Sequence, residues 1–233
     1  MSINIDYFAL KKDVKVPSSF VIAPQDAINK SGADLILTGD PEADRAAIQQ
    51  AIHDLHNARE STDIAIRIDF LGGTIDVGTK TDGNAIVIPL GYDNIHLYGN
   101  GVKIVGDVED SDYVEIYSVF INNADNVIID GFNIVNNASD YVDYGYCLFN
   151  SGTNCTITGN ICSSDGDGLS NTGTSCTITG NICSGRYYGL YNTGTSCTIT
   201  GNTCNASGYA GLYNAGTNCT ITGNTCSSDG DGL

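Results

Sequence analysis

The sequence predicts an all-β solenoid, because a short repeat runs through its C-terminal part. Four copies begin at Gly152, Gly173, Gly194 and Gly216, at steps of 21, 21 and 22 residues. A fixed period of this length is typical of proteins in which each repeat buries its apolar side by stacking on its neighbours. The segment CTIT in each copy has the alternation of a β-strand. The chain also contains 28 glycines and only 4 prolines, as expected for many tight turns in an ordered array.

The N-terminal 39 residues are expected to form an arm or attachment segment, or part of a cap. Alternating apolar residues in SINIDYFAL (2–10) and ADLILTG (33–39) indicate short strands. The segment DPEADRAAIQQAIHDLHNA (40–58) then predicts an amphipathic helix. Asp40 suits the N-cap and Pro41 the first helical position, and four apolar residues follow the helical i, i+3, i+4, i+7 spacing: Ile48, Ala51, Ile52 and Leu55. We expect this helix to cover the open end of the solenoid.

Short strands follow the helix, separated by Gly or Asp-Gly elements. They are predicted at IAIRIDF (64–70), GTIDVG (73–78), AIVIPL (85–90), NIHLYG (94–99) and VKIVGD (102–107). One strand can be followed from this early region into the repeats. The segment NIHLYG (94–99) aligns with NVIIDG (126–131) and with NCTITG (154–159) in the first repeat. The early coils are therefore longer, and we expect the extra residues to form loops at 108–120 and 136–146.

Three of these segments carry a resemblance to a known group of proteins. The helix residues Asp44 to Ile52, the segment Gly72 to Val77 and the segment Asn94 to Gly101 resemble the N-terminal part of the pectate-lyase-like superfamily, which includes polysaccharide lyases, glycoside hydrolases and phage tailspikes. The resemblance implies a right-handed parallel β-helix with an N-terminal capping helix. It covers residues 40–233, with irregular coils at 40–151 and regular repeats at 152–233.

The interior of the repeats is expected to hold stacked cysteines and asparagines. Eight of the nine cysteines form pairs at Cys-x6-Cys spacing, and Cys147 stands alone. Stacked strands lie about 4.8 Å apart, but aligned Cβ vectors give poor disulfide geometry. We therefore expect a ladder of buried free thiols and no zinc site, since its ligands must converge. Two asparagine ladders are expected from Asn150, Asn171, Asn192 and Asn214, and from Asn160, Asn181, Asn202 and Asn224. The glycines before the second set, Gly159, Gly180, Gly201 and Gly223, suit a turn with positive φ.

Two outward features are candidates for function. The first is a flat array of threonines that resembles the surface of ice-binding β-solenoids or simply forms a soluble face: Thr156/Thr158, Thr177/Thr179, Thr198/Thr200 and Thr220/Thr222. The second is a strip of aromatic residues and carboxylates that is able to stack on sugar rings and bind their hydroxyls. Its candidate glycan-binding residues are Tyr144, Tyr146, Asp165, Asp167, Tyr187, Tyr188, Tyr191, Tyr209 and Tyr213.

Catalysis by the same strip is a weaker hypothesis. Asp143, Asp165 and Asp167 are candidates for the carboxylate pair of a glycoside hydrolase. The alternative is that SSDGDG is only a turn. No cofactor is expected, although the Asp-x-Asp pairs offer a weak Ca²⁺ site. A lyase needs a basic residue beside Ca²⁺-binding acids, and Arg186 is the one basic residue of the repeats, with no lyase motif around it.

The net charge of −17 argues against nucleic acid or an anionic membrane as a partner. The N-terminus lacks the basic and apolar regions of a secretory signal, yet the repeats look like an extracellular surface. A virion protein released by lysis reconciles the two. We therefore predict a virus-tail or cell-surface appendage that recognises polysaccharide. The alternatives are a polysaccharide lyase or glycoside hydrolase, and a structural or ice-binding solenoid.

The repeat in progress at Leu233 predicts that the solenoid continues or that another subunit covers its end. A homo-oligomer is expected, and the resemblance to tailspikes implies a trimer.

Overall fold

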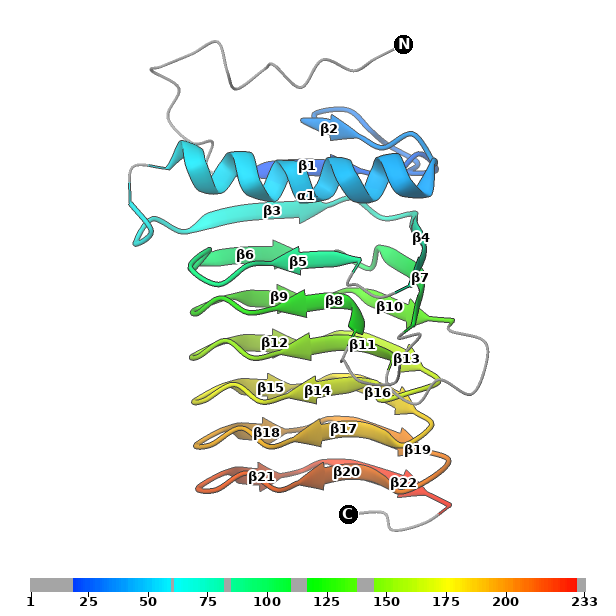
Figure 1. Cartoon of the computed structure of the whole chain (residues 1–233), viewed down its shortest axis with the longest axis vertical. Helices are drawn as coiled ribbons and strands as arrows, with labels where there is room; N and C mark the ends of the chain where they lie inside the picture. The colour runs from blue at the N-terminus through cyan, green and yellow to red at the C-terminus, as the bar shows by residue number, and fades with distance from the viewer. Residues whose placement is uncertain (1–18, 60, 82–84, 110–116, 138–144, 230–233) are drawn as a thin grey trace.

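The protein is a right-handed parallel β-helix with one helix across its N-terminal end (Figure 1). The computed structural model describes residues 19–59, 61–81, 85–109, 117–137 and 145–229. Every strand pairing among these residues is parallel, and each coil contributes one strand to each of three sheets. The fold expected from the sequence is therefore confirmed.

The nine-stranded sheet extends furthest toward the N-terminus. Its strands, in spatial order, are β2 (Leu35–Ile36), β1 (Phe20–Ala23), β3 (Ile66–Phe70), β6 (Ile95–Tyr98), β9 (Ile128–Asp130), β12 (Thr156–Thr158), β15 (Thr177–Thr179), β18 (Thr198–Thr200) and β21 (Thr220–Thr222). One interior column of this sheet is aliphatic from β3 onward: Ile68, Leu97, Ile129, Ile157, Ile178, Ile199 and Ile221 lie in register.

The seven-stranded sheet carries one column of cysteines. Its strands are β4 (Thr74–Thr81), β7 (Lys103–Glu109), β10 (Asn133–Asn136), β13 (Ile161–Ser164), β16 (Ile182–Gly185), β19 (Thr203–Ala206) and β22 (Thr225–Ser228). The column begins as isoleucine in β4, β7 and β10 and continues as Cys162, Cys183, Cys204 and Cys226. The thiols thus occupy positions where the early coils bury aliphatic side chains.

The six-stranded sheet contains β5 (Ile86–Ile88), β8 (Tyr117–Asn122), β11 (Gly145–Asn150), β14 (Leu169–Asn171), β17 (Tyr188–Asn192) and β20 (Ala210–Asn214). The ends of the two segments that the sequence assigns to long loops, 108–120 and 136–146, belong to strands here. Val119 and Phe120 of β8 are fully buried, because this coil still needs apolar side chains to fill its interior. The loop prediction is therefore wrong for these ends.

Helix α1 (Pro41–Ala58) caps the stack as predicted, and Figure 1 shows it lying across the end of the coils. Asp40 accepts a hydrogen bond from the Ala43 amide at 2.9 Å, and Ile48, Ala51, Ile52 and Leu55 are buried. Gln49 closes the edge of the six-stranded sheet, since its side-chain amide bonds to both the nitrogen and the oxygen of Val87. Strands β1 and β2 extend the nine-stranded sheet beyond the coils, since β1 pairs with β3 and β2 pairs with β1.

The expected segment 33–39 contains β2, whereas SINIDYFAL (2–10) lies outside the described residues. The five strands expected at 64–107 are confirmed as β3 to β7.

Both asparagine ladders are present. In the first, each side-chain nitrogen donates to the side-chain oxygen of the next coil at 2.6–2.7 Å, and the ladder begins one rung earlier than predicted, at Asn122. The same nitrogen also donates to a backbone carbonyl at the start of the next turn, as Asn171 does to Gly173 at 3.2 Å. The second ladder runs from Asn160 to Asn224 with rungs of 3.0–3.1 Å. These amides find hydrogen-bond partners inside the core, as buried polar groups must.

The cysteines are free thiols, and seven of the nine are buried. Cys147 is also part of the interior, because its thiol donates to the Ser163 oxygen at 2.9 Å. Burial, together with the neighbouring Cys162, raises the pKa of the Cys147 thiol well above its usual range. The thiol ladder expected from the sequence is confirmed.

The first ladder yields a stability prediction. Asn171→Ala removes the side-chain oxygen that accepts from Asn150, and it removes the side-chain nitrogen that donates to the Asn192 side-chain oxygen and to the Gly173 backbone oxygen. Because unsatisfied buried polar groups cost about 1–3 kcal/mol each, we expect the free energy of unfolding to fall by about 3 kcal/mol in urea titration. Asn205→Ala, at an exposed asparagine, is the matched control and should change it by less than about 0.5 kcal/mol. Equal effects of the two substitutions would contradict a structural role for the ladder.

Candidate functional site

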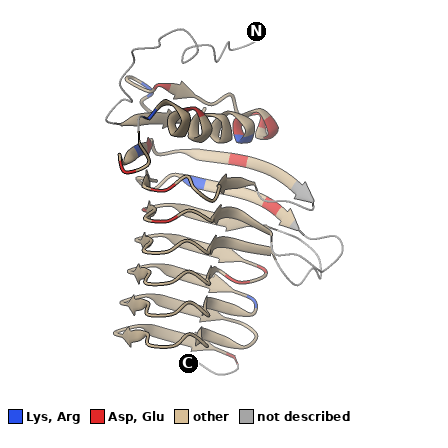
Figure 2. Cartoon of the chain, turned by 60° about the vertical axis from the view of Figure 1, so that its left-hand side comes forward, with Lys and Arg blue, Asp and Glu red and all other residues tan. Residues whose placement is uncertain are grey.

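The variable part of the repeat is the turn that leads from the seven-stranded to the six-stranded sheet. It lies between β13 and β14, between β16 and β17, and between β19 and β20. The copies read SSDGDG, SGRYYG and NASGYAG at this point. The charged residues of the late coils lie at this edge, while the rest of these coils is uncharged (Figure 2). The sequence differences between coils are thus gathered on one side of the protein.

Five tyrosines meet beside this turn and form what we call the tyrosine cluster: Tyr187, Tyr188, Tyr191, Tyr209 and Tyr213. Tyr191 and Tyr213 are register partners in β17 and β20, and their rings are stacked with centroids 5.4 Å apart and planes at 5°. Tyr188 is central, with its ring centroid 5.0–5.6 Å from those of Tyr191, Tyr209 and Tyr213. The cluster is open to solvent, since Tyr209 is 59% and Tyr213 41% exposed.

The phenols of Tyr188 and Tyr191 are neutral at neutral pH. Burial raises the pKa of Tyr188 and Tyr191 above the usual value of 10, and the nearby Asp167 carboxyl raises both further. Their hydroxyls are therefore both donors and acceptors. Arg186 lies over the ring of Tyr187 at 5.6 Å from its centroid. The cluster offers aromatic surface and hydroxyls at one place, as a carbohydrate site does.

Asp167 and Asp165 differ in where their carboxyl groups lie. Asp165 is exposed, whereas Asp167 is only 6% exposed and accepts a hydrogen bond from the Tyr188 amide at 3.1 Å. The turn holding Asp167 is packed tightly between coils: a side chain on Gly166 would meet the Gly145 oxygen, and one on Gly168 the Gly189 oxygen. Burial raises the pKa of Asp167 from 3.8 to about 7. Asp167 is thus not a surface residue of the expected strip but a carboxyl group inside it.

The other predicted site residues are not all gathered here. Tyr146 is only 8% exposed, because strand β11 begins at Gly145 and carries it into the folded body, where its ring lies 6.0 Å from that of Phe149. Its expected place in an exposed loop is therefore not what the structure shows. Asp143 and Tyr144 lie outside the described residues.

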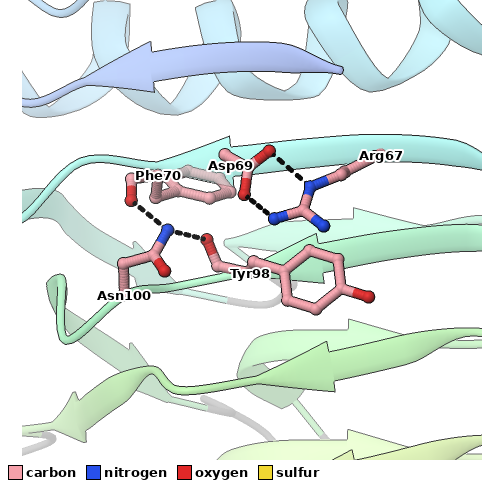
Figure 3. A network of polar contacts seen from close by, with 5 residues as sticks. All are labelled: Arg67, Asp69, Phe70, Tyr98 and Asn100. Atoms are coloured by element: carbon pink, nitrogen blue, oxygen red, sulfur yellow. Dashed lines mark hydrogen bonds and ion pairs between the residues drawn. The ribbon is translucent and has the colours of Figure 1, made fainter. Parts of the chain in front are cut away.

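A second polar group lies on the outer face of β3 and β6 (Figure 3). Arg67 forms a two-pronged pair with Asp69 at 2.7 Å, and its guanidinium carbon lies 4.1 Å from the ring centroid of Tyr98. Asn100 donates to the backbone oxygens of Phe70 and Tyr98. Because Arg67 already covers the Tyr98 ring, this face offers a ligand less aromatic surface than the tyrosine cluster does.

The threonine array lies in register on β12, β15, β18 and β21. Its hydroxyls are partly used within the protein, since Thr179 donates to the Thr200 backbone oxygen at 2.9 Å. The rows are regular, but nothing beyond their regularity marks them as a binding site.

Sequence reasoning missed a second positive-φ position in each coil. This position lies two residues after the first glycine of each repeat and has a φ of 56–58°. It is occupied by Asn154, Ser175, Ser196 and Asn218. Asn tolerates this conformation better than Ser. The recurrence of Asn or Ser before the first cysteine was the available signal. These residues fix the corner that leads into each threonine strand.

Comparison with known families supplies a name for the architecture. The model of one family, described as periplasmic copper-binding protein (NosD), matches residues 77–233, which is about two thirds of the chain. The chain belongs to the NosD family. No curated protein and no solved structure matches it. The NosD match supports the β-helix, while the finer assignment to the pectate-lyase-like superfamily rests on the sequence resemblance alone.

The family description raises the question of whether copper fits this NosD-family chain. Copper sites need thiolate, thioether or imidazole ligands that converge on one point. Within the described ranges, no group of three or more His, Cys, Asp and Glu side chains could hold a metal ion. The interior thiols instead follow one another along the stack and donate to carbonyl groups, as Cys176 does to Gly152 at 3.2 Å. The described residues therefore do not fit a copper centre with three or more protein ligands.

No helix in the described part of the chain combines the length and the apolar character required to span a bilayer.

The buried Asp167 predicts how stability depends on pH. Its pKa is higher in the folded state, about 7, than its ordinary 3.8, so the folded state binds the proton more tightly. This contribution is fully present below about pH 4 and is lost as pH rises to 7, by at most about 1.4 kcal/mol per pH unit. Asp167→Asn keeps the acceptor oxygen but does not ionise, so it should lack the decline and raise Tm at pH 7. Melting scans at several pH values test this, with the exposed Asp165→Asn as control; an unchanged or lower Tm for Asp167→Asn at pH 7 would overturn it.

Proposed function

We propose that this NosD-family protein is a β-helical surface protein that recognises polysaccharide through its tyrosine cluster. It acts outside the cytoplasm, at a cell surface or as part of a virus tail. The observation that carries the proposal is the solvent-open group of five tyrosines at the turn where the coils differ in sequence. The periplasmic description of the NosD family supports an extracytoplasmic location.

The shape of the solenoid also favours an extended ligand. Tyr191 and Tyr213 are register partners in neighbouring coils, so the aromatic surface extends along the stack over these two coils. A polysaccharide presents repeated rings in the same way, and stacking of neighbouring coils places contacts about 4.8 Å apart. Assembly of several copies, as a homo-oligomer such as a trimer, would multiply these contacts and raise the avidity.

Enzymatic cleavage is the second candidate, and one observation favours it. The pKa of Asp167 near 7 is that of a general acid. A glycoside hydrolase needs a second carboxylate about 5–10 Å away, and Asp165 is exposed on the same turn. Incubation of the protein with a glycan that it binds distinguishes binding alone from hydrolysis. Shortened products from the wild type and none from Asp167→Asn would replace the binding function with hydrolysis.

The tyrosine cluster gives the main test. A glycan array identifies a ligand, and titration calorimetry then compares the wild type with the double variant Tyr191→Ala, Tyr213→Ala. We expect at least tenfold weaker binding, because each aromatic contact contributes about 0.5–1.5 kcal/mol beyond its buried area. The control is Thr177→Ala, Thr198→Ala on the nine-stranded sheet, which should bind as the wild type does. Absence of any glycan ligand, or full affinity of the tyrosine variant, would refute the proposal.

A further inference from the structure

Asp167 is a buried carboxyl group beside aromatic rings, and no basic side chain of the described residues forms an ion pair with it. The ion pair found in that part of the chain joins Arg67 to Asp69, on another sheet. Arg186, the basic residue of the repeats, lies over Tyr187. The hydrogen bond that Asp167 receives comes from the neutral Tyr188 amide. A buried carboxylate is costly unless a positive charge or several hydrogen bonds compensate it.

The rings around this carboxyl group also favour a positive charge. Tyr188 follows Asp167 one coil later and donates its backbone amide to the Asp167 carboxyl group at 3.1 Å, and Tyr191 lies in the same strand, β17. The faces of tyrosine rings attract cations, most strongly where water is excluded. Tyr209 and Tyr213 extend the same aromatic surface to solvent. Aromatic rings with a carboxylate nearby are an arrangement that holds ammonium groups.

The charge of the whole protein acts in the same direction. The net charge is −17, and the late coils carry a single basic residue, Arg186 (Figure 2). An acidic polysaccharide would be repelled as it approached, whereas a cationic one would be attracted. The aromatic surface, the buried carboxylate and the overall field therefore select the same kind of ligand.

We propose that the tyrosine cluster and Asp167 together bind a cationic ammonium group carried by the glycan. The ligand class is an amino-sugar polymer or a glycan decorated with a quaternary ammonium. The ammonium group lies against the rings of Tyr188 and Tyr191, and Asp167 neutralises its charge. This inference rests on the proposed glycan recognition and names the chemistry that the same site selects.

The test compares two oligosaccharides that differ in charge. One is an oligomer of N,N,N-trimethylglucosamine, whose charge does not depend on pH, and the other is the N-acetylglucosamine oligomer of equal length. Calorimetry at pH 8 and physiological salt keeps Asp167 ionised. We expect the wild type to bind the trimethylated oligomer at least tenfold more tightly. Asp167→Asn should reduce this preference to less than threefold, while Asp165→Asn, which removes the same net charge from an exposed position, should retain it.

Free choline serves as a second probe and identifies the source of the ammonium group. Binding of choline that is lost in Asp167→Asn assigns the site to the ammonium group alone. Binding of the trimethylated oligomer without choline assigns it to an amino sugar. Equal affinity of the wild type for the two oligomers, or equal losses in the two aspartate variants, would overturn the inference and leave glycan recognition standing. If neither oligomer, choline nor any array glycan binds, the proposed function itself fails.

Discussion

The hydrogen bond from one buried asparagine amide to the next sets the geometry on which the rest of the structure depends. Asn150, Asn171 and Asn192 occupy the same place in successive coils, and the 2.7 Å rungs between them allow little variation in coil height or rotation. Each net hydrogen bond contributes only about 1 kcal/mol, but an unmade one inside the core costs more. The main effect of the ladder is therefore to destabilise arrangements in which the coils are out of alignment. The rung is kept where the coils differ in length, since the asparagines that it joins are 28, 21 or 22 residues apart in the sequence.

Close stacking also explains the glycine at the start of each repeat. A Cβ atom on Gly173 would lie 2.1 Å from the Gly152 oxygen of the preceding coil, and one on Gly194 would lie 2.0 Å from the Gly173 oxygen. The same positions receive the second hydrogen bond of each ladder amide. The residue types at interior and corner positions are thus constrained by contacts between neighbouring coils. The turn between the seven-stranded and six-stranded sheets tolerates change. Asp167, Tyr187 and Tyr209 lie in this turn, and the other tyrosines of the cluster lie beside it in β17 and β20. Because Tyr191 and Tyr213 are register partners, the stacking of the coils also fixes the relative positions of these two residues.

Elements with a clear period could be predicted from the sequence. The helix at Pro41–Ala58, the strands from β3 to β7, the cysteine ladder and both asparagine ladders follow from alternation and from the repeat itself. The side chains of the turns could not, because a turn has no alternation to divide inside from outside. Asp167 is buried and Asp165 exposed for a reason that lies in the neighbouring coils, whose backbones press against Gly166 and Gly168. Tyr146 was misplaced because the start of β11 at Gly145 has no marker in the sequence.

The central claim is that in-register stacking of whole coils holds this protein together, and deletion of residues tests it most directly. Removal of the 21 residues 173–193 takes out one complete coil and joins Thr172 to Gly194 as two repeats are normally joined. The account predicts a cooperatively folded protein, shorter by about 4.8 Å along the stack. Removal of only 20 residues, 173–192, instead places Thr193 at the corner position of Gly173, where a Cβ atom would lie 2.1 Å from the Gly152 oxygen. Urea unfolding should show a loss of several kcal/mol for the 20-residue deletion alone; equal stability of the two deletion variants would contradict the account.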